Sequence, residues 1–306
     1  MTILPPSVCP FCHHDSATVT VSKETMRSGT LWRILACNEC GCYYPYKEIG
    51  SGKASGNDIT NTELSHRINL ADYANYRSYF PNESISWRLK RFLKPFGFPL
   101  DARYFLRRYL RPSGSALDVG AADGRFCYLL QQLGYESMGI EPLDELATLA
   151  RKNNLRVFTG YFPHDIPDEI QNQKFSLISA MESLYYMPDI REALAKMNYM
   201  LEPGGHVLIK ALNSQSTYFR AHGHTLASRY GDNTQAMPNV NALQYWLIKS
   251  GFRISAITGG GKATHNRLIT DFAVKITYGL SPFGINLFDV RKAEALVVLA
   301  QKIQPA

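Results

Sequence analysis

Long apolar runs, low-complexity segments and internal repeats are all absent from this chain of 306 residues. No stretch approaches the roughly 18 uncharged apolar residues that a membrane-spanning helix needs, so we expect no membrane span. The opening residues also lack the basic and apolar regions of a secretory signal. A hydrophobic content of 45% with 19% charged residues argues against a disordered chain. These absences predict a globular protein, which we place in the cytoplasm.

Strong charge of one sign is absent as well. Lys and Arg total 33 against 26 for Asp and Glu, which leaves a net charge of +7 with no dense basic block. A mild excess of this kind permits contact with nucleic acid or with acidic substrates, but it indicates neither by itself.

Cysteine is scarce beyond the first 42 residues, where only Cys127 occurs. The other five cysteines cluster near the N-terminus: Cys9, Cys12, Cys37, Cys40 and Cys42. In a cytoplasmic chain such a cluster indicates a metal site, since disulfides would be reduced. The two Cys-x-x-Cys pairs, 9/12 and 37/40, offer four thiolates to a tetrahedral Zn²⁺. Strand-like runs over residues 17–22 and 30–36 would bring the pairs together. We therefore expect a zinc ribbon over residues 1–50.

A closed four-cysteine site leaves the metal no open position, so we expect a structural zinc. A redox Cys-x-x-Cys or simple apolar burial would explain one pair but not two. Cys42, His13 and His14 are possible substitute ligands, which we treat as bystanders because the four-cysteine set is complete without them.

Residues 51–112 differ in composition from what precedes and follows them. A Gly- and Ser-rich run over residues 50–58 predicts a flexible linker. It is followed by aromatics and arginines at helical spacing, broken by prolines. Such a segment can stack on nucleotides, but we favour an apolar face that packs on the next domain as a cover.

Residues 113–306 alternate short apolar strands with helical segments. The strands are expected at 115–119, 136–140, 156–158, 175–180, 206–211, 252–258 and 294–301. The pattern predicts an α/β fold: a Rossmann-like, seven-stranded, mostly parallel sheet with helices on both faces. In such sheets ligands bind at the carboxyl ends of the strands, near the switch in strand order.

A glycine-containing loop follows the first of these strands. Gly120 and Gly124 permit a tight turn before a helix at 126–133, whose first N–H groups can receive a carboxylate. The dinucleotide fingerprint is not met, because Ala122 and Arg125 occupy two of its glycine positions. Glu141 ends the next strand, where a carboxylate can take both ribose hydroxyls of an adenosine.

These residues resemble the class I S-adenosylmethionine-dependent methyltransferases over about residues 113–301. Asp118, Gly120, Ala122 and Gly124 match the family's D-x-G-x-G-x-G loop with alanine at the middle glycine, Glu141 matches its ribose-binding acid, and Leu201–Ile209 is similar to its L-x-P-G-G turn. A ribbon ahead of this domain also resembles a bacterial subset that modifies sugars and other small molecules.

The resemblance implies S-adenosylmethionine as the cofactor. The residues expected to bind it are Asp118, Gly120, Ala121, Ala122, Gly124, Glu141, Pro142, Tyr161, Phe162 and Met181. Asp118 is suited to the cofactor's ammonium group. Tyr161 or Phe162 can stack on the adenine, although filling of the core explains these two aromatics equally well.

Methyl transfer from a sulfonium needs alignment, exclusion of water and, for some acceptors, a base. The candidate catalytic residues are Glu182, Tyr185 and Tyr186 after the fourth strand, and His222 and His224 in an insertion at 213–239. Related O-methyltransferases often have a Glu-His pair where this chain has two tyrosines, which argues against a histidine base there and against a metal-assisted mechanism.

A second insertion, at 259–289, contains an apolar stripe at helical spacing. We expect both insertions to act as lids. A dimer interface or contact with a membrane surface would produce the same stripe.

Three functions are consistent with the whole sequence. We favour a methyltransferase that acts on a small molecule, such as a sugar or secondary metabolite. The second is an RNA methyltransferase that grips phosphates with the ribbon and basic surface. Against it, four basic and four acidic residues leave the ribbon with no net charge, and an Asn-Pro-Pro-Tyr type motif is missing. The third is a non-catalytic binding protein that retains the fold.

Overall fold

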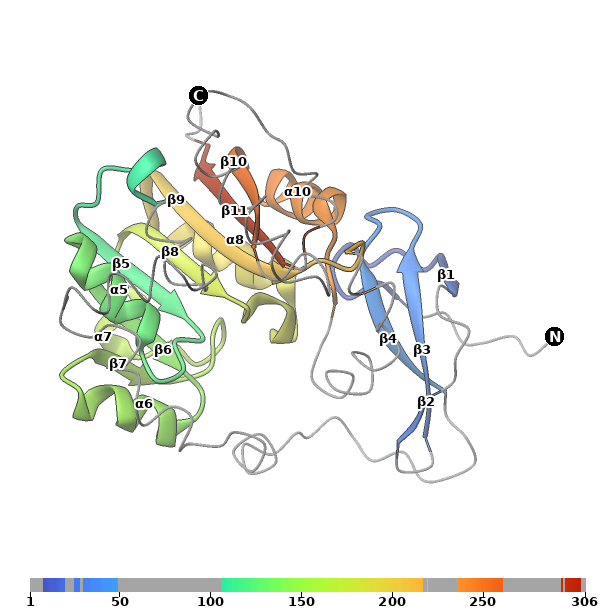
Figure 1. The fold of residues 1–306 in the computed structure, drawn as a ribbon, viewed down its shortest axis with the longest axis horizontal. Coiled ribbons are helices and arrows are strands. Elements are labelled where there is room, and N and C mark those ends of the chain that lie inside the picture. The colour runs from blue at the N-terminus through green and yellow to red at the C-terminus, as the bar shows by residue number, and fades with distance from the viewer. Residues whose placement is uncertain are drawn as a thin grey trace, which may run out of the picture.

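The computed structural model describes residues 8–19, 25–27, 30–48, 106–216, 219, 236–260, 293 and 295–303. They form a four-stranded N-terminal sheet and a seven-stranded sheet with helices (Figure 1). The larger sheet consists of β5 (Ser115–Val119), β6 (Glu136–Glu141), β7 (Arg156–Thr159), β8 (Phe175–Met181), β9 (Leu201–Leu212), β10 (Phe252–Gly260) and β11 (Ala295–Lys302).

The strand order of the larger sheet is β10-β11-β9-β8-β5-β6-β7. Strands β5 to β9 pair in parallel, whereas β11 runs antiparallel to both β9 and β10. This confirms the expected Rossmann-like, mostly parallel sheet. Because the chain leaves β5 towards β6 on one side and returns to β8 on the other, the order switches at β5. The carboxyl edges of β5, β6 and β8 therefore surround the place where such sheets bind ligands.

Helices cover both faces of this sheet, as the sequence predicts. They are α5 (Arg125–Leu133), α6 (Asp144–Lys152), α7 (Asp168–Gln171), α8 (Ile190–Met200) and α10 (Val240–Lys249), with a short 3₁₀ turn η2 (Leu184–Tyr186). Apolar residues of α5 pack with one face of the sheet, including Ala116 and Leu208. Apolar residues of α8 and α10 pack with the opposite face, including Ile178 and Ile209. The alternation of side chains along each strand produces both surfaces.

The N-terminal module is an antiparallel sheet of β1 (Ala17–Val19), β2 (Thr25–Arg27), β3 (Thr30–Cys37) and β4 (Tyr43–Glu48). Strand β3 pairs with all three others. The two strand-like runs expected from sequence correspond to β1 and β3, and the small antiparallel sheet fits a ribbon. Cys9 and Cys12 lie in the turn before β1, Cys37 ends β3, and Cys40 and Cys42 lie in the turn between β3 and β4.

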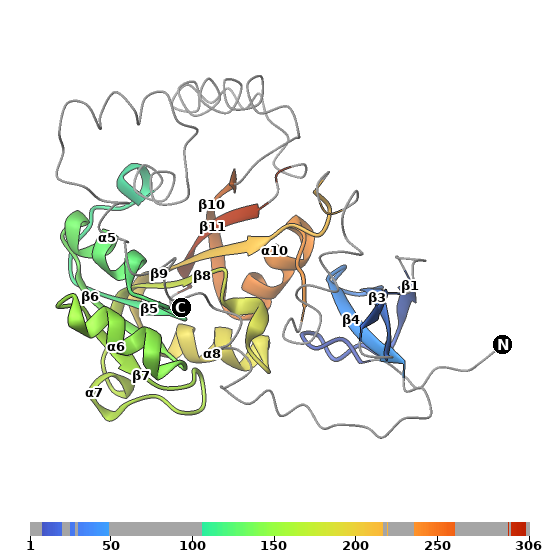
Figure 2. The same cartoon turned by 60° about the horizontal axis from the view of Figure 1, so that its bottom comes forward.

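The ribbon packs against α10 (Figures 1 and 2). The ring of Phe11 stacks on Trp246 with centroids 4.6 Å apart. Asn239 caps α10 by accepting the N–H of Ala242 at 2.9 Å, and its amide donates to the carbonyl of Gly41 at 2.7 Å. A two-way backbone bridge joins Tyr43 of β4 to Met237. The buried residues of ribbon and domain consequently form one continuous core.

Several predicted features lie outside the described residues. These are most of the lead-in, at 51–105, and most of the two insertions, including His222, His224 and the apolar stripe at 268–276. The domain boundaries at 50 and 112 therefore stay predictions. Within the part of the chain that the structure describes, no helix has the length and apolar character needed to cross a membrane.

Candidate active site and metal centre

The loop after β5 turns through three residues with left-handed backbone conformations. Gly120, Ala122 and Gly124 have φ angles of 75°, 49° and 82°. Residues other than glycine rarely adopt this left-handed backbone region, which explains why related loops have glycine at the middle position. Ala122 adopts it nevertheless, at a steric cost that glycine would not have.

Close packing also limits this loop. A Cβ atom added to Gly120 would lie 2.4 Å from the Cβ of Ser183, and one added to Gly124 would lie 2.6 Å from Cδ1 of Leu155. The hydroxyl of Ser183, which follows β8, donates to the carbonyl of Val119 at 2.5 Å. The turn after β8 thus rests directly on the β5 loop.

Most amide groups of the loop make internal hydrogen bonds. The N–H groups of Gly120 and Ala121 donate to the carbonyl of Ile140 at 2.9 and 3.1 Å, and that of Gly124 donates to Ala121 at 2.9 Å. These amides hold the loop against β6. That the first N–H groups of the following helix receive a carboxylate stays a prediction.

Glu141, at the end of β6, connects the loop to the next helix. Its Oε2 accepts the N–H of Ala122 at 2.8 Å and its Oε1 accepts the N–H of Leu143 at 3.1 Å. The side chain is buried, and burial raises the pKa of Glu141 while the two backbone donors oppose this. Carboxylate oxygens have about four lone-pair sites, so these bonds leave capacity for hydroxyl donors.

Asp118, on β5, is the most perturbed acid of the site. It is 1% exposed, and the hydroxyl of Ser179 on β8 donates to its Oδ1 at 2.6 Å. Burial, with a smaller contribution from the charge of Glu141, raises the pKa of Asp118 to about 8. A cation beside this carboxyl would favour its ionised form.

A third acid, Asp123, is buried in the same loop. Arg125 donates to its Oδ2 at 2.8 Å. Its pKa is raised by burial, and Arg125 opposes the shift. Three buried carboxyls near one loop disfavour each other's ionisation, so the loop is suited to a positively charged ligand. S-adenosylmethionine, with its ammonium and sulfonium groups, fits this environment.

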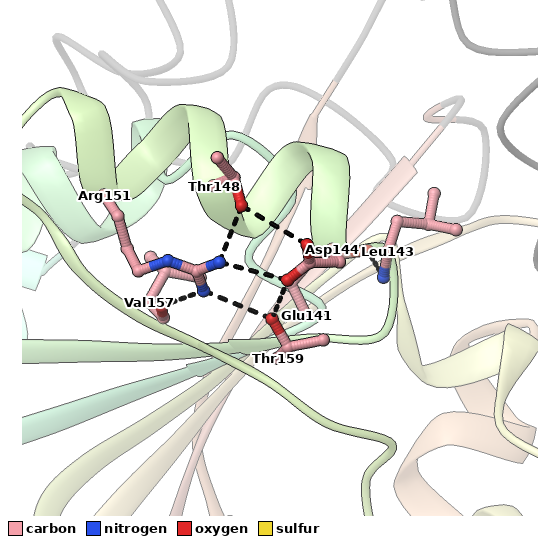
Figure 3. Close-up of polar contacts among 7 residues, drawn as sticks. All are labelled: Glu141, Leu143, Asp144, Thr148, Arg151, Val157 and Thr159. Carbon is pink, nitrogen blue, oxygen red and sulfur yellow. Dashed lines mark hydrogen bonds and ion pairs between the residues drawn. The ribbon is translucent and has the colours of Figure 1, made fainter.

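A polar network fixes α6 next to Glu141 (Figure 3). Asp144, in the first turn of α6, accepts from the Thr159 hydroxyl at 2.6 Å and from Arg151 Nη2 at 3.0 Å. Arg151 also donates to the carbonyl of Val157 at 3.1 Å. The network joins both ends of α6 to β7 and so holds the backbone that follows Glu141.

The aromatic candidates beyond β7 differ in exposure. Tyr161 is 40% exposed, whereas Phe162 is 5% exposed and belongs to the core. Burial raises the pKa of the Tyr161 hydroxyl. Of the two, Tyr161 has the more accessible side chain. Pro142 and Met181 are half-buried at the carboxyl ends of β6 and β8.

Glu182 follows β8 in a left-handed conformation, with φ of 63°. Its N–H donates to the carbonyl of Lys210 on β9 at 2.8 Å, and its carboxylate forms an ion pair with the Lys210 ammonium. Sequence reasoning missed Lys210. The available signal was a single charged residue inside the otherwise apolar run Val207–Leu212.

The two tyrosines of the catalytic prediction lie in η2. Tyr185 is 2% exposed and belongs to the core, whereas Tyr186 is partly buried. Their ring centroids are 4.5 Å apart. The structure therefore places Glu182 nearest the strand ends, with Tyr185 inside the core.

The predicted metal ligands converge. The Sγ atoms of Cys9, Cys12, Cys37 and Cys40 all lie within 4.8 Å of one another. Two of the separations are 3.6 Å, between Cys9 and Cys40, and 3.4 Å, between Cys12 and Cys37. Zn–S bonds of about 2.3 Å in a tetrahedron place sulfurs about 3.8 Å apart, so the cluster has the size of a zinc site.

The three bystander candidates near this cluster are placed differently. Cys42 is fully buried with its Sγ 3.4 Å from that of Cys9, although it is not part of the mutually close set. His13 and His14 are exposed. The peptide N–H of Cys40 points at the sulfur of Cys37 at 3.5 Å, a contact that stabilises thiolate charge.

Sequence comparison identifies relatives of the larger domain. The family model described as a methyltransferase domain matches residues 89–256, more than half of the chain. A ubiquinone biosynthesis O-methyltransferase of Serratia proteamaculans is 26% identical over 165 residues, which is 50% of this chain and 66% of the relative. Another, of Proteus mirabilis, is 28% identical over 32% of this chain and 41% of the relative. The matches thus span less than two thirds of these relatives.

Comparison of structures finds the same fold. An S-adenosylmethionine-dependent methyltransferase of Thermotoga maritima, described as a possible histamine N-methyltransferase, superposes with a TM-score of 0.53. The match covers 79% of this chain and 100% of the other at 16% identity, which establishes the shared fold alone. Together with the family match, it confirms the resemblance seen in the loop motifs. The chain belongs to the methyltransferase-domain family and has the class I, S-adenosylmethionine-dependent form of its fold.

Proposed function

We propose that this protein transfers a methyl group from S-adenosylmethionine to a small-molecule acceptor. The observation that carries the proposal is the acidic cradle at the carboxyl edges of β5 and β6, where Asp118 and Glu141 are buried beside a left-handed loop. When bound, S-adenosylmethionine supplies an electrophilic methyl group on a positively charged sulfur. The protein's task is to hold that group, align the acceptor and exclude water.

The cofactor-binding roles follow from position and charge. Asp118 would hold the cofactor's ammonium, and Glu141 would accept the ribose hydroxyls while it keeps the loop in place. Tyr161 would lie against the adenine. Gly120, Ala121, Ala122 and Gly124 would shape the loop surface, with Pro142, Phe162 and Met181 completing the walls.

The contacts between the ribbon and the larger domain support a small-molecule acceptor. The turn residues Phe11 and Gly41 and the β4 residue Tyr43 contact α10 and the segment before it. Ribbon residues that are engaged with the larger domain in this way are not available to stack on RNA bases. The named activity of the ubiquinone biosynthesis relatives, O-methyl transfer in the synthesis of a small molecule, agrees with this choice.

We further propose that Cys9, Cys12, Cys37 and Cys40 hold one structural Zn²⁺. All six cysteines are free thiols, and the four converge at the spacing of a tetrathiolate site. The ribbon would occupy residues 1–50, the linker and cover 51–112, and the methyltransferase domain 113–306.

The proposed function is tested by two assays on the full chain. Titration calorimetry with S-adenosylhomocysteine measures cofactor binding without an acceptor. Release of S-adenosylhomocysteine from S-adenosylmethionine is then measured with separate panels of phenols, sugars, amines and transfer RNA. We expect one-to-one binding and turnover with a member of a small-molecule panel. Turnover with RNA alone would contradict the small-molecule assignment, and lack of binding would contradict the enzyme assignment.

A further inference from the structure

Lys210 lies at the carboxyl end of β9, directly beside Met181 of β8 in the parallel register. Leu208, two residues earlier on β9, faces the side of the sheet that α5 covers, and Ala116 of β5 faces the same side. Because side chains alternate along a strand, Lys210 and Asp118 project from that same face. Their Cα positions are separated by two strand spacings and two residues, about 12 Å. Strand β8 lies between them, so a cofactor whose amino group lies at Asp118 would cross the carboxyl end of β8 to bring its reacting end towards Lys210.

Lys210 is buried at this position, whereas its partner reaches solvent. The side chain of Lys210 is 11% exposed and that of Glu182 is 43% exposed. Leu208, the preceding residue on the same face of β9, is a fully buried apolar residue. Burial of a charge is costly, and a buried ion pair is often no more stabilising than apolar residues of similar volume. Stability alone therefore does not account for a lysine here.

The backbone of Glu182 also indicates that this ion pair has a functional role. A non-glycine residue with φ of 63° costs free energy, and such residues concentrate at functional sites. The conformation is held by the N–H of Glu182, which donates to the Lys210 carbonyl, and by Ser183, whose hydroxyl donates to the carbonyl of Val119 at the end of β5. The strained turn thus directs a carboxylate to the ammonium of Lys210 at the edge where β5 and β8 end.

We propose that Lys210 is a catalytic residue of the acceptor site, where its ammonium, held by Glu182, binds the oxygen of a hydroxyl acceptor and stabilises the negative charge that develops there. The proposal rests on the proposed function and narrows its substrate class to acidic hydroxyls, such as phenols and enols. An ammonium has three donors and can bridge a carboxylate and an acceptor oxygen. Preorganised charge of this kind is a large contribution in catalysis.

Glu182 and Lys210 account for the proton and the charge that move in this reaction. The acceptor O–H gives its proton to the Glu182 carboxylate, which is exposed enough to pass it to solvent. The oxygen's electron pair forms the bond to the methyl carbon, while the carbon–sulfur bond of the cofactor breaks and its electron pair stays on sulfur. Lys210 keeps its proton throughout. Methylation of an amine would instead build positive charge next to Lys210, which disfavours amine acceptors.

The first test separates Lys210 from cofactor binding. Lys210→Met removes the charge with little change in shape, Lys210→Arg retains it, and Lys152→Met is a control at an exposed lysine of α6. We expect all three variants to bind S-adenosylhomocysteine within about threefold of the wild-type Kd, since Lys210 lies outside the cofactor cradle. Wild-type protein that binds no S-adenosylhomocysteine would overturn the proposed function.

The second test uses 4-nitrophenol as an acceptor probe in the S-adenosylhomocysteine complex, at a pH where the free probe is mostly protonated. We expect the wild type and the Lys152→Met control to bind it as the absorbing phenolate. Lys210→Arg should retain part of this signal, and Lys210→Met should lower it at least tenfold. If the complex binds no 4-nitrophenol, or if Lys210→Met binds the phenolate as well as the wild type does, the role of Lys210 is wrong while the proposed function stands.

The third test follows turnover with S-adenosylmethionine. Wild-type protein should methylate 4-nitrophenol in preference to benzylamine, and Lys210→Met should reduce kcat/KM for the phenol by on the order of 10²-fold. Faster methylation of benzylamine would overturn the hydroxyl assignment.

Discussion

The carboxylate of Glu141 accepts the peptide N–H of Ala122 at 2.8 Å, across 19 residues of chain. This bond joins the end of β6 to the left-handed position of the loop after β5. The residue proposed to hold the ribose is therefore also the residue that holds the loop around the rest of the cofactor. Loss of its carboxylate should affect the shape of the loop as well as a direct contact.

Replacement of Glu141 by alanine should weaken S-adenosylhomocysteine binding. A lost charge-assisted hydrogen bond costs roughly 1.5–3 kcal/mol, which corresponds to about 10- to 150-fold in Kd. Melting temperature should also fall, because the N–H groups of Ala122 and Leu143 lose their partner. Calorimetry and thermal melts check both results, with Glu145→Ala on the exposed side of α6 as the control. Unchanged affinity in Glu141→Ala would exclude the ribose role.

Asp118 should release a proton when the cofactor binds. Its pKa of about 8 leaves the carboxyl mostly protonated at pH 7, and a neighbouring ammonium would lower that pKa. Binding at pH 7 should then release up to about 0.9 proton. Calorimetry in buffers of different ionisation enthalpy measures this number, and Asp118→Asn should abolish the release. Binding with no proton release in the wild type would contradict an ammonium at Asp118.

The same carboxyl predicts a pH dependence of stability. Because its pKa is raised from 3.8 to about 8, the folded state holds a proton between these values that the unfolded chain has lost. The contribution of Asp118 to stability therefore falls as pH rises through this window. Asp118→Asn, which has no such proton, should gain stability relative to the wild type from pH 4 to pH 8 in denaturant titrations. A constant difference would show that Asp118 is not buried as described.

Ala122→Gly should preserve or raise stability. A left-handed conformation costs an L residue about 1–2 kcal/mol, whereas the greater freedom of glycine in the unfolded chain costs about 0.4–1 kcal/mol. The net gain should be between zero and about 1.6 kcal/mol. Ala195→Gly, at an exposed interior position of α8, should lose about 1 kcal/mol. Denaturant titration distinguishes the two, and a loss of similar size at both positions would refute the strain assigned to Ala122.

Cysteine variants test the metal centre. The purified chain should contain one zinc, and Cys37→Ser should lower the zinc content and the melting temperature. Cys42→Ser removes a buried thiol outside the four-cysteine set and should retain one zinc. Elemental analysis with thermal melts measures both quantities. Zinc-free protein with a normal melting temperature would exclude a structural metal.

The sequence predicts the larger sheet closely, because periodicity and glycine position are local signals. Strand β5 has the predicted bounds, and the other strands agree apart from extensions such as β9, which begins at Leu201. The loop motif and Glu141 were likewise readable from spacing. The strained backbone of Ala122 could not be predicted from spacing, because its φ angle depends on how the loop closes against β6.

Contacts between distant segments could not be predicted in this way. The bond from Asn239 to Gly41 joins residues 198 positions apart, and nothing local to either residue indicates the other. The pairing of Lys210 with Glu182 depends on strand order, because β8 and β9 must be neighbours in register. The burial of Tyr185 could not be predicted either, because it depends on the position of this residue in the 3₁₀ turn η2 and not on its residue type.

The most direct test of the whole account is a crystal structure of the full chain with S-adenosylhomocysteine. We predict that the ligand lies across the carboxyl ends of β5 and β6, with its ribose hydroxyls on the Glu141 carboxylate and its ammonium beside Asp118. A ligand bound elsewhere, or a different molecule held between these two carboxyls, would contradict the methyltransferase assignment of this site.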